Sequence, residues 1–211
     1  MKNVLVIGGT GLIGSSIAKE FAEKKHNVFI TGTKPKDKVD ISRNLTYLMF
    51  DLSAINSYDS FFSRILSQIG NVDVLIYSAG IHSRVDFLKA KEDDFDRYMA
   101  VGIKGLFFFM QKFFQYFGQT SECTVIVINS ISSYQAAITP NQISKWAIRG
   151  FIKGISKEFY GKGISIFGLA PHRIVQCDAK EDETNINDLI EIIIQMVSSK
   201  SQYDTGDTIV C

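Results

Sequence analysis

The chain has 211 residues, of which 45% are hydrophobic and 21% are charged, a composition that suits one globular domain with a sizeable core. The formal net charge is +1 and no long basic run occurs, which disfavours nucleic acid and membranes as partners. Cys123, Cys177 and Cys211 are odd in number and lack C-x-x-C spacing, so we expect reduced thiols in a cytoplasmic protein and no disulfide framework or metal site.

The first predicted element is a buried strand at residues 4–7, which runs directly into a glycine-rich turn and then a helical pattern. Gly8, Gly11 and Gly14 follow at a spacing of three residues. The first glycine permits a tight turn, the second lets the backbone approach a pyrophosphate, and the third lets helix and strand pack closely. A plain glycine turn is the alternative, but the position at the first strand-to-helix turn favours dinucleotide binding. The predicted cofactor loop comprises Gly8, Thr10, Gly11, Leu12, Ile13 and Gly14.

The second predicted strand, residues 28–30, leads into hydroxyl and basic side chains. In dinucleotide-binding folds an acidic residue at this point bonds the 2′-hydroxyl of NAD, whereas basic or small polar residues leave room for the 2′-phosphate of NADP. Thr31, Thr33 and Lys34 follow this strand, and the first acidic residue is Asp37. The pattern favours NADP over NAD, with Thr33 and Lys34 as binding residues. The alternative is that Lys34 is a solvated loop lysine.

Strands and helices alternate along the rest of the chain. We expect further strands at residues 45–50, 72–77, 125–128, 164–169 and 207–210, and helices at 12–25, 55–69, 95–117, 140–155 and 187–197. This alternation predicts an α/β fold over residues 1–211, with one Rossmann-type, doubly wound parallel sheet of about seven strands and helices on both faces. Ligands bind such sheets at the carboxyl ends of the strands. The polar residues predicted at those ends are Thr10, Thr33, Asp51, Ser78, Ser130, Lys145 and His172.

The helices at 95–117 and 140–155 carry much apolar surface. The second half of the first is apolar nearly all round, so we expect it to lie between the sheet and either another helix or a second subunit. In the second helix we expect one buried stripe, with Asn141 and Lys145 together on another face. That stripe comprises Ile143, Trp146, Ala147, Phe151 and Ile155.

This order of landmarks resembles the short-chain dehydrogenase/reductase family over essentially the whole chain. Asp51 and Leu52 resemble the pair that holds the adenine ring in that family. Ser78, Ala79 and Gly80 are similar to the family's N-A-G element after the fourth strand. The resemblance implies that these five residues bind the cofactor.

The catalytic landmarks of the family follow the fifth predicted strand. Ser130 matches the substrate-binding serine, and Lys145 matches the lysine of the Y-x-x-x-K signature, which also holds the ribose hydroxyls of the cofactor. Because the loop after Ser130 is short, Ser132 and Ser133 are alternatives for the serine. Pro171 resembles the start of the family's P-G turn, which implies a further cofactor contact.

The chain departs from the family at two positions of the catalytic tetrad. Asn141 stands where the resemblance expects the tyrosine that acts as general acid, and an amide cannot supply a proton at neutral pH. Gly102 stands where many members carry a structural asparagine. Losing a positioned general acid costs about 10²–10⁴-fold in rate. Tyr134, His82 and His172 are candidates to replace the proton donor. The favoured alternative is that Tyr134 is a partly exposed loop aromatic and that both histidines are surface imidazoles.

The resemblance implies an NADP-dependent oxidoreductase for a ketone, aldehyde or 3-oxoacyl substrate, with an atypical site built from Ser130, Lys145, Asn141 and Tyr134. The alternative is a cofactor-binding protein with impaired catalysis that acts as a sensor or partner subunit. A sugar-nucleotide epimerase or dehydratase ranks last, because that branch needs a larger substrate domain. Residues 176–188 have no strong pattern and imply a short lid over a small or open pocket. The two apolar helices resemble the pair that packs across the family's dimer axis, which implies a homodimer or homotetramer.

Overall fold

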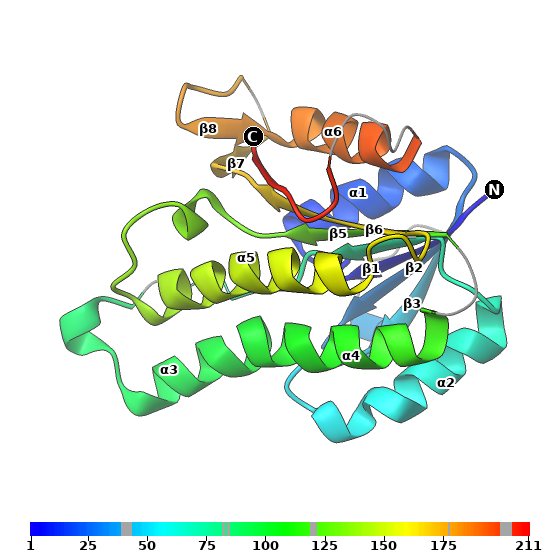
Figure 1. Ribbon diagram of the computed structural model, residues 1–211, viewed down its shortest axis with the longest axis horizontal. Coiled ribbons are helices and arrows are strands. Elements are labelled where there is room, and N and C mark those ends of the chain that lie inside the picture. The colour runs from blue at the N-terminus through cyan, green and yellow to red at the C-terminus, as the bar shows by residue number, and fades with distance from the viewer. Residues whose placement is uncertain (39–43, 82, 84, 119–121, 177, 199–203) are drawn as a thin grey trace.

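The computed structural model describes the chain except for residues 39–43, 82, 84, 119–121, 177 and 199–203. Within the described residues, a seven-stranded parallel sheet in the order β3-β2-β1-β4-β5-β6-β9 forms the centre of the molecule (Figure 1). Its strands are β1 (Asn3–Ile7), β2 (Asn27–Gly32), β3 (Leu45–Met49), β4 (Val74–Tyr77), β5 (Cys123–Ile128), β6 (Ile164–Ala170) and β9 (Thr208–Val210). The strand order reverses between β1 and β4, the switch point at which such sheets bind ligands. The predicted Rossmann-type, doubly wound sheet is confirmed.

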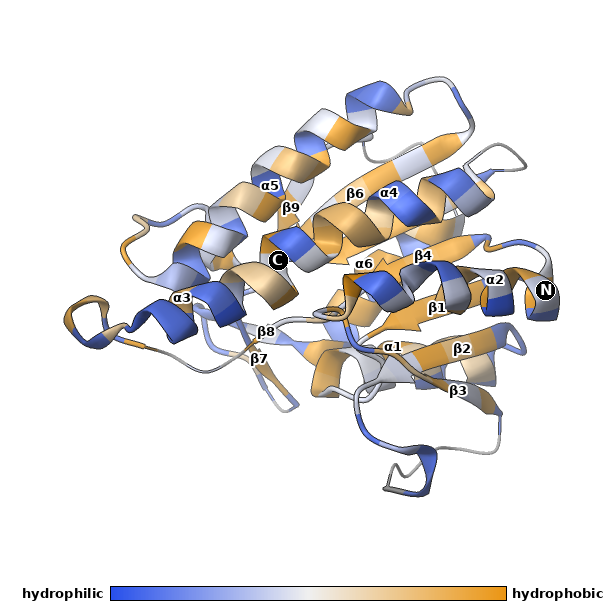
Figure 2. Ribbon diagram, turned by 90° about the horizontal axis from the view of Figure 1, so that it is seen from below, coloured by the Kyte–Doolittle hydropathy of each residue, from blue (hydrophilic) through white to orange (hydrophobic). Residues whose placement is uncertain are grey.

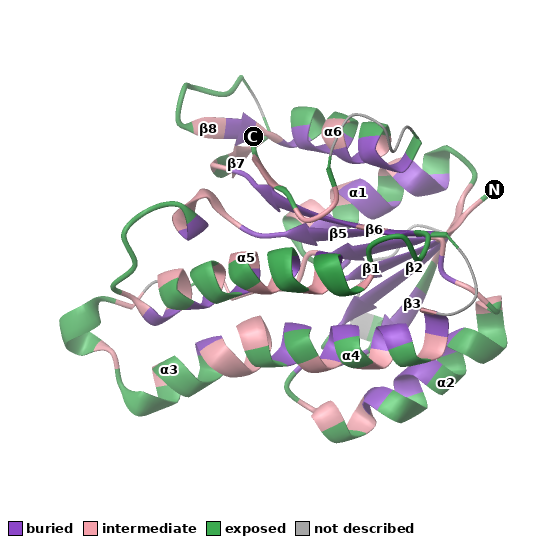
Figure 3. Ribbon diagram, in the orientation of Figure 1, coloured by how far each residue is buried: buried purple, intermediate pink, exposed green. Residues whose placement is uncertain are grey.

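Two layers of helices cover the sheet (Figure 1). One face carries α1 (Leu12–Glu23) and α6 (Ile186–Ser198), and the other carries α2 (Tyr58–Ile69), α4 (Gly105–Phe117) and α5 (Pro140–Glu158). The central strands are hydrophobic (Figure 2) and buried (Figure 3), as a parallel sheet covered on both faces requires. None of the described helices combines the length and the apolar character that a membrane span requires.

Aromatic side chains fill the layer between the sheet and the α2–α4 pair. Phe50 stacks on Phe61 with ring centroids 3.9 Å apart, and the rings of Phe62 and Phe109 lie 5.0 Å apart. Phe109 and Phe113 of α4 are fully buried. The prediction that one side of the apolar helix lies on the sheet is therefore confirmed, and aromatic packing accounts for much of the phenylalanine in this chain.

The helix predicted at 95–117 is interrupted. A π-helical turn, η4 (Ala100–Lys104), separates α3 (Glu92–Met99) from α4, and Gly102 within it has the non-helical angles φ −75° and ψ −105°. A Cβ built at Gly102 would lie 3.2 Å from the Ser144 Cβ, so this turn approaches α5 closely. Apolar periodicity does not reveal such a turn, because a π-helical insertion changes the backbone and not the hydropathy of the side chains.

The buried stripe predicted for α5 is wrong at its first positions. Ile143 and Trp146 are 40% and 44% exposed, and the buried face carries Ser144, Ile148 and Ile152 instead. The buried face of α5 is turned toward η4, where Ser144 packs against Gly102, so the small serine and not the neighbouring Ile143 lies at this close contact.

The segment between β6 and α6 contains two strands that the sequence did not predict. β8 (Glu183–Asn185) pairs with β7 (Arg173–Val175) in parallel. The buried Thr184 hydroxyl accepts a hydrogen bond from the His172 N–H at 3.0 Å and donates to the Cys211 carbonyl at 2.5 Å. These bonds tie β8, which lies within the segment where a short lid was predicted, to the end of the last strand.

Candidate active site

The glycine turn after β1 has the geometry of a phosphate-binding loop. Gly8 has φ +77°, and the Gly11 N–H donates to the Gly8 carbonyl at 3.1 Å. A Cβ at Gly14 would lie 2.4 Å from the Gly8 carbonyl oxygen. The start of α1 is therefore too close to the turn for any side chain at position 14. Gly11 is the N-cap of α1, and no side chain caps the helix. The first turn of α1 is therefore suited to an anionic ligand.

Two further glycines shape this turn and were absent from the predicted set. A Cβ at Gly9 would lie 2.6 Å from the Ile30 Cβ, and a Cβ at Gly32 would lie 2.7 Å from the Thr10 side chain. Thr31, at the end of β2, is buried, and its hydroxyl accepts a hydrogen bond from the Gly8 N–H at 3.1 Å. The glycines at the ends of β1 and β2 were visible in the sequence, but only the packing of β2 against the turn shows why they are required.

The loop after β2 is held by a tyrosine of the neighbouring strand. The Tyr47 hydroxyl donates to the Lys34 carbonyl, and burial raises the pKa of Tyr47. The side chains of Thr33 and Lys34 are exposed, and Lys36 of the short helix η1 (Lys36–Lys38) is exposed as well. This edge of the sheet therefore presents a fixed backbone with basic and hydroxyl side chains.

The predicted adenine-binding pair lies at the carboxyl end of β3. One Asp51 carboxylate oxygen accepts from the N–H and the hydroxyl of Ser53, both at 2.8 Å, while Asp51 itself is exposed. Leu52 is buried, and its carbonyl accepts from the Tyr58 hydroxyl at 2.7 Å. These bonds fix the conformation of both residues at the carboxyl end of β3.

The turn after β4 brings the glycine loop and the predicted lysine together. A Cβ at Gly8 would lie 2.9 Å from the backbone of Ala79, so the glycine turn and the Ser78–Gly80 turn pack against each other. On the α5 side, a Cβ at Gly80 would lie 3.5 Å from the Lys145 Nζ. The glycine turn, the Ser78–Gly80 turn and Lys145, which lie far apart in the sequence, therefore come together at the carboxyl ends of the strands.

The residue that follows β5, Asn129, fixes the backbone of Lys145. The Asn129 side-chain N–H donates to the Lys145 carbonyl at 3.1 Å, and burial lowers the pKa of Lys145 to about 8. The Asn129 Oδ1 is buried, and no hydrogen-bond partner for it exists among the described residues. Asn141 lies one helical turn before Lys145 on the same face of α5, as predicted. Asn129 was not predicted, because its role depends on a contact between β5 and α5.

The three candidate serines differ in what their hydroxyls do. Ser130 caps the short helix η5 (Ile131–Ser133), and its Oγ lies 3.2 Å from the Ser132 N–H and 3.3 Å from the Ser132 Oγ. Ser133 is fully buried, and its hydroxyl donates to the Ser130 carbonyl at 2.8 Å. Ser130 and Ser132 thus form a hydroxyl pair at the partly exposed end of β5, whereas the Ser133 hydroxyl is bonded internally.

The candidate proton donors lie in different surroundings. The Tyr134 hydroxyl donates to the Thr208 carbonyl at 2.5 Å, and the Arg149 guanidinium lies 3.6 Å from the centre of its ring. The His172 N–H bonds Thr184, as described above, while the Pro171 carbonyl accepts from the Ile131 N–H at 3.0 Å and so joins the serine segment. His82 lies outside the described residues.

A doubly wound parallel sheet with a glycine turn at its first strand-to-helix junction is the architecture of dinucleotide-binding proteins. The family described as short chain dehydrogenase matches residues 2–196 of this chain. The chain therefore belongs to the short chain dehydrogenase family of NAD(P)-dependent oxidoreductases.

Several curated relatives are similar over most of this chain. The 3-oxoacyl-[acyl-carrier-protein] reductase FabG of Staphylococcus aureus is 29% identical over 237 aligned positions, which cover 99% of this chain and 95% of the relative. The 2-dehydro-3-deoxy-D-gluconate 5-dehydrogenase of Dickeya dadantii is 27% identical over 81% of this chain and 70% of its own length. Because this chain has only 211 residues, the Staphylococcus alignment includes residues that this chain lacks.

The fold is also similar to a solved structure. A short chain dehydrogenase from Leptospira borgpetersenii, crystallised with bound NAD+, superposes with a TM-score of 0.87 at 22% identity. The similarity covers 99% of this chain and 90% of that one. At this level of identity the comparison supports the fold, which agrees with the strand order described above.

Proposed function

We propose that residues 1–211 act as one NAD(P)-binding domain, a cytoplasmic NADP-dependent reductase of a small carbonyl compound, with 3-oxoacyl thioesters as the first substrate class to test. The observation that carries this proposal is the position of the Lys145 ammonium against Gly80, beside the glycine turn. The names of the curated relatives support the choice of substrates, since they include a 3-oxoacyl reductase and a dehydrogenase of a keto sugar acid.

The residues present fit a bound dinucleotide. Gly8 and Gly14 leave no room for side chains where a pyrophosphate approaches, and the start of α1 has no side-chain cap. Lys145 would hold the nicotinamide ribose, and Pro171 would lie beside the nicotinamide. Asp51, together with Leu52, would hold the adenine ring. The bound cofactor supplies a hydride, and the protein supplies position, charge and a proton.

The preference for NADP rests on the loop after β2. Thr33 and Lys34 are exposed there, and Lys36 adds a second positive charge nearby in the sequence. A 2′-phosphate carries negative charge that these groups would bind, whereas an acidic residue that would bond the 2′-hydroxyl of NAD is missing before Asp37.

The test measures the oxidation of NADPH from the decrease in its absorbance. The substrates are a panel of 3-oxoacyl thioesters, ketones and aldehydes. We expect turnover with at least one class, at a rate below that of a reductase with an intact tyrosine, because Asn141 occupies that position. Tight NADPH binding without any oxidation across the panel would contradict the reductase proposal. It would then favour the second function, a sensor or partner subunit, which Asn141 and Gly102 motivate.

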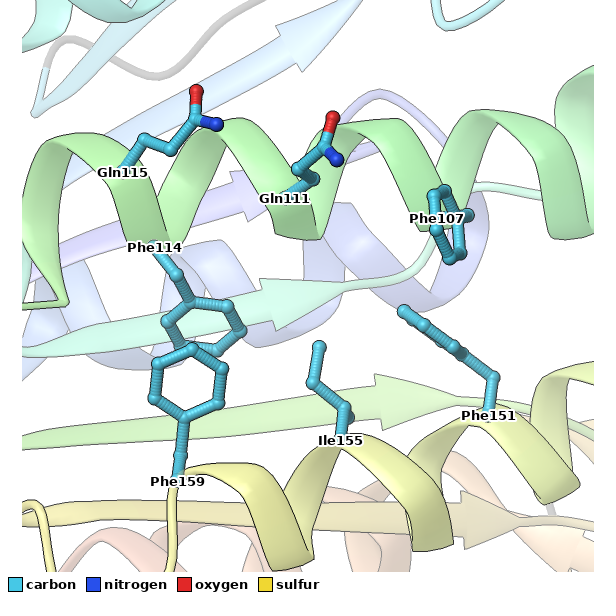
Figure 4. Close-up of a pocket in the computed structure, with 7 residues that line it drawn as sticks. All are labelled: Phe107, Gln111, Phe114, Gln115, Phe151, Ile155 and Phe159. Atoms are coloured by element: carbon cyan, nitrogen blue, oxygen red, sulfur yellow. The ribbon is translucent and has the colours of Figure 1, made fainter.

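We also propose that the protein is a homodimer or homotetramer assembled through α4 and α5. An apolar groove of about 370 Å³ lies between these helices on the outer face of the protein (Figure 4). Its lining residues are Phe107, Gln111, Phe114, Gln115, Phe151, Ile155 and Phe159. Phe107 is 43% exposed, although it contacts Phe151 with ring centroids 5.4 Å apart. A second copy packed on this groove would cover that apolar surface.

A further inference from the structure

The reduction proposed above requires a proton donor, and the inference below rests on that proposed function. When a carbonyl carbon accepts a hydride, its oxygen gains negative charge and must receive a proton. Asn141, at the position of the expected tyrosine, can donate a hydrogen bond but cannot release a proton at neutral pH. Some other group must therefore supply it.

The hydroxyl groups of Tyr134 and Ser133 already donate hydrogen bonds within the protein. The Tyr134 hydroxyl donates to the Thr208 carbonyl at 2.5 Å, and stacking of Arg149 on its ring holds it there. The Ser133 hydroxyl donates to the Ser130 carbonyl and has no solvent exposure. Either proton could move to a substrate only after a bond within the protein had broken.

Lys145, by contrast, is a cationic donor fixed at the site. Its Nζ lies at the Gly80 turn, and Gly80 has no side chain to separate the ammonium from a ligand held there. The Asn129 side chain bonds the Lys145 carbonyl, and the Asn129 N–H donates to the Leu169 carbonyl at 2.6 Å. These bonds connect the backbone of Lys145 to the ends of β5 and β6, so the lysine has a defined position relative to the sheet.

We propose that the Lys145 ammonium is the proton donor of this active site, in the role that the tyrosine has elsewhere in the family. The carbonyl carbon would gain a C–H bond from the hydride that a bound reduced dinucleotide would supply, and the dinucleotide would thereby be oxidised. The electron pair of the broken C=O π bond forms an O–H bond with a proton from the Lys145 Nζ. Lys145 is left as a neutral amine and regains its proton from solvent.

The electrostatic surroundings of Lys145 favour this role. Burial lowers the pKa of Lys145 to about 8, which makes the ammonium a stronger acid near neutral pH. Desolvation is the cause of that shift. Other charged groups near Lys145 come from the described elements that pack against α5. Among these elements, η5 and β6 carry no titratable side chain, and η4 carries Lys104. The titratable residues of α3 are Glu92, Asp93, Asp94, Asp96, Arg97 and Tyr98, and those of α5 besides Lys145 are Arg149, Lys153, Lys157 and Glu158.

The first experiment compares the unaltered protein with Lys145→Arg, which keeps a positive charge but does not release a proton in the accessible pH range. Lys153→Arg, at an exposed position of the same helix, is the matched control. NADPH affinity is measured by fluorescence, and the rate of a single turnover is measured with saturating NADPH. We expect Lys145→Arg to keep NADPH affinity within about tenfold and to lose about 10²–10⁴-fold in rate, with the control unchanged.

A second experiment adds primary amines of different acidity to Lys145→Ala and asks whether they restore turnover. We expect partial rescue that depends on the pKa of the amine, as general acid catalysis requires. Independently of activity, the ¹⁵N resonance of the Lys145 Nζ should titrate with a pKa of about 8 in the protein without substrate.

Several outcomes would overturn the role of Lys145. They are turnover in Lys145→Arg within about threefold of the unaltered protein, absence of amine rescue, or an Nζ that stays protonated above about pH 10. A full loss of rate in His172→Gln or His82→Gln, with NADPH still bound, would assign the proton to that histidine instead. If the unaltered protein binds NADPH but reduces nothing, the proposed function itself fails, whereas turnover that survives Lys145→Arg contradicts only the role of the lysine.

Discussion

The Lys145 Nζ lies 3.5 Å from the position that a Cβ on Gly80 would occupy, so a backbone turn after β4 and a side chain of α5 define one wall of the site together. This contact places the ammonium of the partly buried Lys145 beside the turn that packs against the glycine loop.

Gly80 should tolerate a methyl group and reject a branched side chain. The Cβ of Gly80→Ala would make an ordinary van der Waals contact with the Lys145 Nζ, whereas the branches of Gly80→Val would displace the ammonium. We expect Gly80→Ala to bind NADPH within about threefold of the unaltered protein, and Gly80→Val to bind at least about tenfold more weakly. Fluorescence titration measures both. Equal affinities would show that the ammonium does not depend on the space at Gly80.

Gly14 and Gly11 should respond differently to alanine. A Cβ at Gly14 would lie 2.4 Å from the Gly8 carbonyl oxygen, whereas a Cβ at Gly11 would lie 3.5 Å from the same atom. We expect Gly14→Ala to lower the free energy of unfolding by about 1–3 kcal/mol. Gly11→Ala should leave it nearly unchanged, while weakening NADPH binding where the backbone approaches the pyrophosphate. Urea unfolding and fluorescence titration distinguish the two effects. Similar losses of stability in both variants would contradict the geometry of this turn.

The stability of the protein should depend on the protonation of Lys145. Burial lowers the pKa of Lys145 to about 8 in the folded protein, while the unfolded chain has the ordinary value of about 10.4. Below pH 8 both states bind the proton, and the native state carries the full cost of the desolvated ammonium. Between these two values the unfolded chain binds more protons, so the free energy of unfolding rises with pH.

Lys145→Met removes the charge and keeps much of the volume. We expect this variant to be more stable than the unaltered protein at pH 7, by about 1–3 kcal/mol, and the difference to shrink as the pH rises from 8 to above 10. Urea unfolding across this range is the measurement, with Lys153→Met as the exposed control. A difference in stability that is independent of pH would show that the ammonium is not desolvated.

The loop after β2 should determine the choice between the two dinucleotides. Lys34→Ala removes an exposed positive charge, so we expect NADPH binding to weaken by about tenfold and NADH binding to stay within about threefold. Thr33→Asp should shift the preference towards NADH, because a carboxylate repels the 2′-phosphate and bonds the 2′-hydroxyl. Parallel titrations with both cofactors measure the ratio. If the ratio of NADPH to NADH affinity is unchanged in both variants, residues outside this loop determine the cofactor preference.

The α4–α5 groove should be the site of self-association. Phe151→Glu places a charge beside Phe107, where a second copy would otherwise bury both rings. We expect the unaltered protein to be a dimer or tetramer by light scattering at micromolar concentration and Phe151→Glu to be a monomer. Phe87→Glu, at an exposed phenylalanine outside the groove, is the control. A monomeric unaltered protein would contradict the assembly.

Local patterns in the sequence were sufficient for the framework of the fold. The apolar runs around Val6 and Ile76 predict strands buried on both faces, and Gly8, Gly11 and Gly14 predict the turn that the structure shows. These features depend on neighbouring residues, because a strand needs a continuous apolar run and a tight turn needs glycine at a few adjacent positions.

Other features depend on contacts between residues far apart in the chain. The hydropathy of Trp146 predicts burial, yet α5 packs Ser144 against Gly102 and leaves Trp146 44% exposed. Likewise, the pairing of β7 with β8 has no local pattern, since each strand is three residues long and is stabilised by the bonds of Thr184.

The sequence by itself determined the doubly wound sheet, the glycine turn and the presence of Asn141 four residues before Lys145, because all of these are properties of adjacent residues. Only the tertiary structure decided which groups surround Lys145. It placed the ammonium at Gly80, bonded its carbonyl to Asn129 and engaged the Tyr134 hydroxyl with Thr208. The physical reason is that the position and acidity of a side chain depend on what packs around it, and those neighbours come from strands and helices distant in sequence.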